Sequence, residues 1–160
     1  MHGDVVISGN ETWSIDHHVL GNLTVSNGAT LTLENNFVHS VTGNVLVEAN
    51  GTISADGQGH GPDTGPGAGT TGTSGGGGGH GGDGGDGASG ATGGFFNDSG
   101  FLPALPGSGG GSGIRTAGGS GGGVIRLSVG GACQLDGTLS ADGTAGWDSG
   151  NGGTGGGGAG

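Results

Sequence analysis

The chain has 160 residues, of which 50 are glycine and only 28% are hydrophobic, so it offers few side chains for an ordinary globular core. Its formal net charge is −11, and Arg115 and Arg126 are its two basic residues besides histidine. Such a chain cannot neutralise a phosphate backbone, so we expect neither nucleic acids nor anionic membranes as partners. No apolar run approaches the roughly 20 residues of a membrane helix, and we expect no membrane insertion.

Residues 1–57 are predicted to form β-strands. Apolar and polar residues alternate over residues 23–25 and 29–33, the period-two pattern of strands that bury one face. Asn27-Gly28 between them is a turn signal. The residues expected to face inward are Ile7, Trp13, Ile15, Val19, Leu23, Val25, Leu31, Leu33, Val41, Val45, Val47, Ile53 and Ala55.

A repeat appears when the sequence is shifted by 22 residues. Residues 16–25 then align with residues 38–47, and five of the ten positions are identical. A period of about 20 to 25 residues with three short strands per turn is typical of a parallel β-solenoid, because each coil buries its apolar row only against the next. We therefore predict solenoid coils over residues 1–57, although a meander or sandwich would give the same alternation.

Residues 58–122 are glycine-rich, and glycine occupies every third position from Gly69 to Gly93. A glycine required at every third position indicates a three-fold extended helix with one crowded edge, the polyproline-II conformation. Collagen is disfavoured because no intervening pair contains proline. We predict a bundle in which bare glycine edges approach neighbouring carbonyl groups, rather than a flexible linker, which needs no period.

Residues 95–106 form the one apolar, proline-bearing loop of this region. We expect it either to plug an end of the glycine bundle or to act as a sticky contact for another subunit or a ligand. The contact candidates are Phe95, Phe96, Phe101, Leu102 and Leu105.

A β coil is predicted to return over residues 123–143. Residues 137–143 repeat residues 51–57 with a single Ile/Leu exchange, and a glycine-rich run follows both copies. Residues 144–160 are therefore predicted to start a second glycine-rich excursion. The repeating unit is a β coil, a Ser-Ala-Asp-Gly exit, a glycine excursion and re-entry, which favours a fragment or an assembling subunit over a closed domain.

The segments 21–25, 54–57, 121–127 and 140–143 resemble glycine-rich repeat proteins of cell surfaces, in which such coils, exits and re-entry strands alternate. The triplet-glycine stretch is similar to the polyglycine-II bundles of springtail antifreeze proteins and phage tail-fibre adhesins. These resemblances imply an all-β fold of parallel β-solenoid-like coils with an inserted polyglycine-II/polyproline-II helix bundle.

Four asparagines begin N-glycosylation triplets and favour a secreted, extracellular or cell-surface glycoprotein: Asn10, Asn22, Asn50 and Asn97. The weak calcium candidates are Asp56, Asp83, Asp86 and Asp142. They lack the nonapeptide spacing of calcium-binding glycine repeats, and the alternative is that they keep the bundle soluble. His17 and His39, one coil apart, would stack about 4.8 Å from each other, which fits a side-chain ladder better than a metal pair. We expect no metal and no other cofactor.

These patterns predict a non-enzymatic building block of an extracellular fibre or matrix that self-associates. A glycan-binding adhesin, with carbohydrate as its partner, is the main alternative. Ice binding is a lesser alternative, through a hydroxyl face of Thr70, Thr71, Thr73 and Thr92. An enzyme is disfavoured because no nucleophile–base pair can be named, although Asp136 or Asp142 beside an arginine would be its candidate residues.

Overall fold

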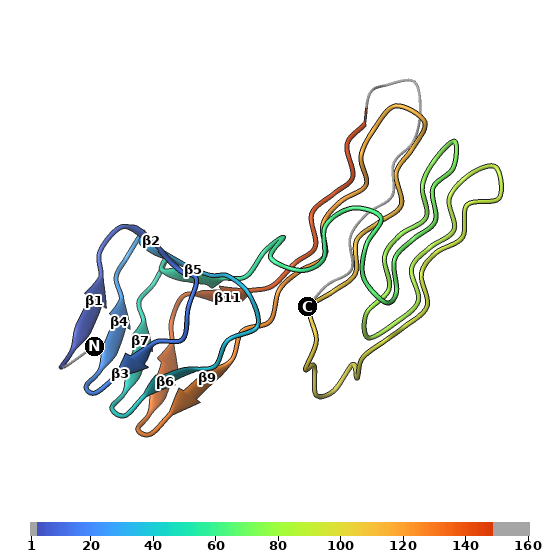
Figure 1. Ribbon diagram of the computed structural model, residues 1–160. Coiled ribbons are helices and arrows are strands. Elements are labelled where there is room, and N and C mark those ends of the chain that lie inside the picture. The colour runs from blue at the N-terminus through green and yellow to red at the C-terminus, as the bar shows by residue number, and fades with distance from the viewer. Residues whose placement is uncertain (1–2, 149–160) are drawn as a thin grey trace. The chain divides into compact units, whose positions relative to one another are not determined.

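The computed structural model describes residues 3–148, which are all β and contain no helix (Figure 1). The chain divides into two compact units. The solenoid unit contains the chain up to Ser54 together with Ile125–Ser140, and the glycine unit contains Ala55–Val124 and the chain from Ala141 on. The glycine-rich segment is thus inserted between two parts of one β unit.

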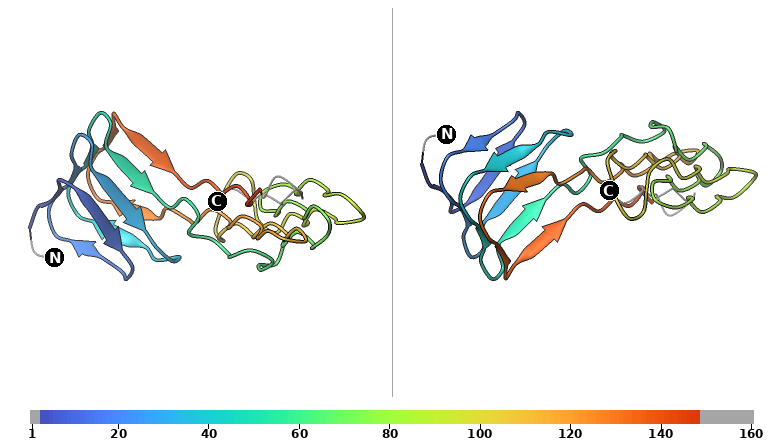
Figure 2. Two further views of the ribbon diagram at one scale, coloured as in Figure 1. Left: turned by 90° about the horizontal axis from the view of Figure 1, so that it is seen from above. Right: turned by 90° about the horizontal axis from the view of Figure 1, so that it is seen from below.

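The solenoid unit is built from coils of short strands, and three sheets form its sides (Figures 1 and 2). The chain-order strands are β1 (Val5–Ile7), β2 (Asn10–Trp13), β3 (His18–Val19), β4 (Leu23–Val25), β5 (Thr30–Leu33), β6 (His39–Val41), β7 (Val45–Val47), β8 (Thr52–Ser54), β9 (Leu127–Val129), β10 (Cys133–Leu135) and β11 (Thr138–Ser140). The sheet orders are β1-β4-β7-β10, β2-β5-β8-β11 and β3-β6-β9. Every pairing is parallel, which excludes a meander or an antiparallel sandwich.

The register between coils follows the sequence repeats. His18 pairs with Ser40 and Leu23 with Val45, so the predicted 22-residue offset is confirmed. Ile53 pairs with Leu139, which places the repeated segments 51–57 and 137–143 in adjacent coils although the whole glycine excursion separates them. We call β9, β10 and β11 together the last coil.

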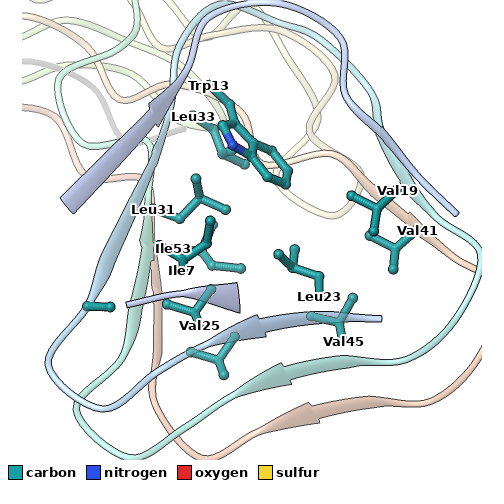
Figure 3. Close-up of a cluster of buried hydrophobic side chains, with 12 residues drawn as sticks. Ile7, Trp13, Val19, Leu23, Val25, Leu31, Leu33, Val41, Val45 and Ile53 are labelled. Carbon is teal, nitrogen blue, oxygen red and sulfur yellow. The ribbon is translucent and has the colours of Figure 1, made fainter. Parts of the chain in front are cut away.

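The core lies inside the three sheets, where the alternating apolar side chains converge (Figure 3). All predicted inward-facing residues are at most 1% exposed except Ile15, for which the prediction is wrong because it is 65% exposed. Ile15 lies in the corner between β2 and β3, where strand alternation no longer decides which side chain faces inward. Each fully buried valine, leucine or isoleucine side chain stabilises the fold by ~1.5–3 kcal/mol.

A hydrogen-bonded ladder joins the coils at the corner before β4, β7 and β10. Asp4 Oδ1 accepts the backbone N–H of Asn22, Asn22 Oδ1 accepts that of Asn44, and Asn44 Oδ1 accepts that of Ala132, each at 2.8 Å. A Cβ atom on Gly43 would lie 2.6 Å from Asn22 Oδ1, so this step of the ladder requires glycine. The Gly-Asn pairs of the repeat are thereby explained.

The described part of the glycine unit contains no β-strand (Figure 2). Backbone hydrogen bonds join its extended segments to one another. Gly77 N–H donates to Gly85 O at 2.8 Å, and Gly77 O accepts from Gly94 N–H at 2.9 Å. Gly76 O of the same segment accepts from Gly111 N–H at 2.7 Å. One segment thus bonds to more than two others, whereas a strand in a sheet has at most two neighbours.

Most of the triplet glycines lie where a neighbouring backbone segment approaches closely. A Cβ atom on Gly75 would lie 1.8 Å from Gly111 O, and one on Gly84 would lie 2.1 Å from Gly77 O. From Gly69 to Gly93, every third glycine except Gly90 would bring a Cβ within 3 Å of another segment, and Gly76 and Gly79 between them would do the same. Gly90 meets nothing within 4 Å but has a φ of +83°, which favours glycine in a turn.

Candidate functional site

The last coil presents uncovered apolar side chains, because no further strand among residues 3–148 pairs with its outer edges. Leu135 and Leu139 occupy the same inward columns as Val47 and Ile53. They are 47% and 42% exposed, whereas Val47 and Ile53 are 1% and 0% exposed. Cys133, the other inward residue of β10, is an exposed free thiol. Within residues 3–148, nothing therefore covers this end of the solenoid.

The opposite end, formed by β1, β2 and β3, is closed by a polar and aromatic cover. Glu11 pairs with Leu31 and so occupies a column that is apolar in the other coils. Its Oε1 accepts the indole Nε1–H of Trp13 at 2.8 Å, and the Trp13 ring stacks on His17 with centroids 4.3 Å apart. Sequence reasoning missed Glu11. The signal was a carboxylate in a column that is otherwise apolar, and this column can be seen only once the pairing register of the strands is known.

His39 lies beneath this cover and is 1% exposed. Its ring centroid is 5.7 Å from that of His17, so the predicted neighbourhood of the two imidazoles is confirmed, and 5.3 Å from that of Trp13. Its Nδ1 is buried without a hydrogen-bond partner. Burial lowers the pKa of His39, His17 lowers it further, and Asp16 partly opposes the shift. These surroundings therefore favour the neutral form of His39.

The aspartates considered for calcium hold backbone groups of neighbouring segments. Asp83 Oδ1 accepts Phe96 N–H at 2.7 Å, and Asp86 Oδ1 accepts Gly93 N–H at 2.9 Å. Asp56 Oδ1 accepts the N–H of Asp142 at 2.7 Å. Within the described range, 3–148, no three His, Cys, Asp or Glu side chains are arranged to hold a metal ion.

The hydroxyls considered for ice binding are partly engaged with each other. Thr70 Oγ1 accepts the Thr92 N–H at 2.7 Å and lies 3.3 Å from Thr92 Oγ1. These two side chains therefore also join neighbouring segments of the glycine unit.

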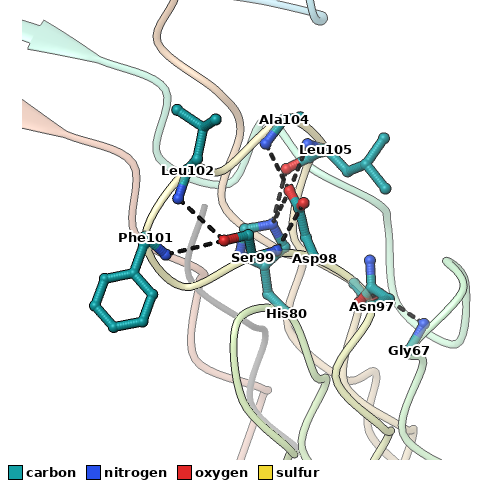
Figure 4. Close-up of polar contacts among 10 residues, drawn as sticks. Gly67, His80, Asn97, Asp98, Ser99, Phe101, Leu102, Ala104 and Leu105 are labelled. Carbon is teal, nitrogen blue, oxygen red and sulfur yellow. Dashed lines mark hydrogen bonds and ion pairs between the residues drawn. The ribbon is translucent and has the colours of Figure 1, made fainter.

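The apolar loop is organised around the carboxylate of Asp98 (Figure 4). Its oxygens accept the backbone N–H groups of Ser99, Ala104 and Leu105 at 2.8, 2.6 and 2.7 Å. His80 Nε2 lies 3.2 Å from Asp98 Oδ2 and 2.8 Å from Leu105 O. The N–H groups of Ala104, Leu105 and Ser99 lower the pKa of Asp98 to about 2, and His80 adds to the shift. The loop is thus built around a carboxylate that stays charged.

The apolar side chains of this loop are exposed, so the predicted plug is wrong. The physical reason is that the backbone N–H groups of the loop point inward, so its apolar side chains point outward. The Asp98 carboxylate accepts the N–H groups of residues 104 and 105, and Ser99 Oγ accepts those of Phe101 and Leu102 at 3.2 Å (Figure 4). The alternative, a sticky contact, stays a prediction. The exposed fractions are 78% for Phe95, 66% for Phe96, 102% for Phe101, 79% for Leu102 and 43% for Leu105.

The four glycosylation candidates lie in different surroundings. Asn10 and Asn50 are exposed, Asn10 on β2 and Asn50 in a turn with a φ of +61°. Asn22 belongs to the corner ladder, and its Nδ2 donates to Asp4 Oδ1 at 3.1 Å. Asn97 Nδ2, the atom that would carry the sugar, is buried without a partner. The folded chain therefore presents Asn10 and Asn50 to solvent and withholds Asn97.

A shallow hollow lies on the outer face of the sheet β1-β4-β7-β10. Val6, Leu46 and Gln134 line it together with the ladder residues Asn22 and Asn44. Its lining combines amides with aliphatic side chains and contains no aromatic ring. It therefore lacks the flat aromatic surface on which a sugar ring could stack.

None of the described residues forms a helix long and apolar enough to cross a membrane. No protein-family model, no curated protein and no solved structure matches this chain.

Proposed function

We propose that this protein is a non-enzymatic structural building block of an extracellular or cell-surface fibre or matrix, and that its copies self-associate. The observation that carries the proposal is the uncovered apolar row of the last coil, with Leu135 and Leu139 nearly half exposed. A strand edge beside uncovered apolar side chains is a template for another strand. Inside the chain, coils of like sequence already cover each other in this way.

In this proposal the glycine unit is a polyglycine-II bundle that serves as a stiff body. A three-fold helix directs successive peptide groups toward three sides, so one segment can bond to several neighbours. The bonds from the Gly76–Gly77 segment to Gly85, Gly94 and Gly111 support this conformation, as does the close approach at every third glycine. Rigidity then comes from backbone hydrogen bonds, because a side-chain core is almost absent.

Secretion and glycosylation belong to the same proposal. Asn10 and Asn50 present exposed acceptor triplets on the solenoid unit. Sugars at these positions would add polar bulk to the sides of the solenoid, where they would keep associated copies hydrated. Intact mass measurement of material from a secreting eukaryotic host would show whether sugars are attached.

Electron microscopy and light scattering of the purified protein test the proposal. Regular assemblies larger than the monomer are expected at micromolar concentration, and addition of a thiol reagent that places a charge on Cys133 should reduce them. Dispersed monomers at every concentration up to about 100 µM, a range in which weak specific contacts are populated, would contradict it.

A glycan-binding adhesin is the second candidate, favoured by the ordered loop that exposes Phe95 and Phe101. Aromatic rings offer apolar faces at low conformational entropy cost, which suits contact with sugar rings. A glycan array probed with the whole chain and with Phe101→Ala distinguishes the two candidates. Glycan binding that is lost in Phe101→Ala would support the adhesin, and a lack of binding to any glycan would contradict it.

A further inference from the structure

The two ends of the solenoid differ in one inward column. This column contains Glu11, Leu31, Ile53 and Leu139 in successive coils. If the first coil of a second copy stacked on the last coil, the Glu11 carboxylate would lie over Leu139 and lose water without a new partner. Charged residues pointing inward at a sheet edge prevent such pairing. The first coil is therefore a poor partner for the open end.

The last coil is complementary to itself. In the chain, β9 and β11 flank β10, and each of the three strands has three residues. A two-fold axis through β10, perpendicular to the solenoid axis, reverses the direction in which strands run around the coil. It would therefore pair β10 with β10 of a second copy, and β9 with β11 of that copy, all antiparallel.

This arrangement keeps apolar residues against apolar residues. Centring the antiparallel pair on Gln134 places Cys133 opposite Leu135 of the second copy, and both belong to the inward columns of β10. The same register places Asp136 opposite Ala132, so the carboxylates at residue 136 do not face each other. Antiparallel pairs are also slightly more stable per residue than parallel ones.

We propose that the last coil is the interface of a two-fold dimer of this chain, in which both open ends are covered at once. This inference rests on the proposed self-association and names its contact. Two-fold dimers are the commonest symmetric assemblies because the same patch serves both subunits. Because this contact uses the same surface on both subunits, it stops at two copies. The dimer is then the unit from which any fibre grows, and growth uses a different surface, such as the ordered apolar loop.

Sedimentation velocity of the whole chain, with a matched pair of variants, tests the interface. Leu139→Glu places a carboxylate in the inward column of the last coil, and Thr138→Glu places one on the outward face of the same strand. We expect the wild type and Thr138→Glu to dimerise, and Leu139→Glu to dimerise at least tenfold more weakly. Circular dichroism spectra and melting curves of the three proteins show whether each is folded.

A disulfide test identifies the symmetry without relying on the stability of Leu139→Glu. With Cys133→Ser as background, Gln134→Cys should form an intermolecular disulfide on mild oxidation, because residues opposite each other in an antiparallel pair have Cα atoms about 4.5–5.5 Å apart. Val6→Cys in the same background is the control at the other end of the column and should stay reduced.

The outcomes separate this inference from the proposed function. A wild-type monomer, an equally strong dimer of Leu139→Glu, or no disulfide in Gln134→Cys overturns the two-fold interface. If larger assemblies persist in Leu139→Glu, self-association stands and the last coil is not its contact. If the wild type shows neither dimers nor larger assemblies, the proposed function itself is wrong.

Discussion

Gly84 lies so close to the carbonyl group of Gly77 that a Cβ atom at residue 84 would be 2.1 Å from the oxygen. Gly84→Ala should therefore destabilise the glycine unit by ~1–3 kcal/mol, because the two segments must separate to admit a methyl group. Hydrogen exchange of the Gly94 amide, which bonds to Gly77 O, should accelerate. Gly85→Ala is the matched control, since a Cβ there meets nothing within 4 Å. Equal effects of the two substitutions would show that the crowded edge does not determine stability.

Acid should weaken the solenoid unit through His39. Its pKa in the folded chain is below the ordinary histidine value of 6.5, so the unfolded chain takes up a proton first as the pH falls. The stability that neutral His39 contributes is complete above pH 6.5 and declines from there toward the lower, folded pKa. His39→Leu matches Leu127 in the same column and should flatten this decline between pH 7 and 5 in denaturant unfolding. A decline that His39→Leu leaves unchanged would show that His39 is not its cause.

The apolar loop should stay ordered to lower pH than an ordinary aspartate would allow. The pKa of Asp98 is about 2 in the folded chain, against an ordinary aspartate value of 3.8, so the stability that it contributes is complete above pH 3.8 and is lost as the pH falls through 2. In an NMR titration, the amide shifts of Ala104 and Leu105 should have a midpoint near 2. Asp98→Asn should speed exchange of these amides, whereas Asp136→Asn should not. A midpoint near 3.8 would contradict the hydrogen-bonded cage.

The corner ladder should contribute measurably to the pairing of β7 with β10. Asn44→Ala removes the acceptor of the Ala132 N–H, at a cost of ~0.5–1.5 kcal/mol in the free energy of unfolding. Asn44→Asp retains Oδ1 and should cost less. Urea unfolding of the three proteins checks the order of stabilities. If Asn44→Asp were as unstable as Asn44→Ala, the ladder bond would not be the cause.

Glycan occupancy should follow the exposure of each amide nitrogen. In folded protein secreted from a eukaryotic host, glycopeptide mass spectrometry should find sugar at Asn10 and Asn50. Asn97 should be unmodified, because its Nδ2 is buried and a sugar there would open the loop. Ser99→Ala removes the Asn97 triplet and should leave total glycan mass unchanged. Sugar at Asn97 in correctly folded material would refute the buried environment.

Sequence patterns predicted much of the solenoid because its signals are local or strictly periodic. The alternation around Leu23 and Leu31 identified the buried face, and the offset between residues 16–25 and 38–47 identified the coil length. The prediction for Ile15 is wrong because alternation carries no information in a corner between strands. The plug predicted for the apolar loop is wrong because composition cannot show that Asp98 accepts the loop's N–H groups and that Phe101 stays exposed.

The amino-acid sequence by itself determined the coil repeat and most of the inward rows, because both depend on spacing along the chain. The tertiary structure alone decided which end of the solenoid the described residues leave uncovered. Glu11 looks like any polar residue on an alternating strand until its pairing with Leu31 places it in an apolar column. Likewise, Leu139 looks like a core residue until the structure leaves it 42% exposed. Both facts depend on which coil covers which, and contacts between distant residues determine that.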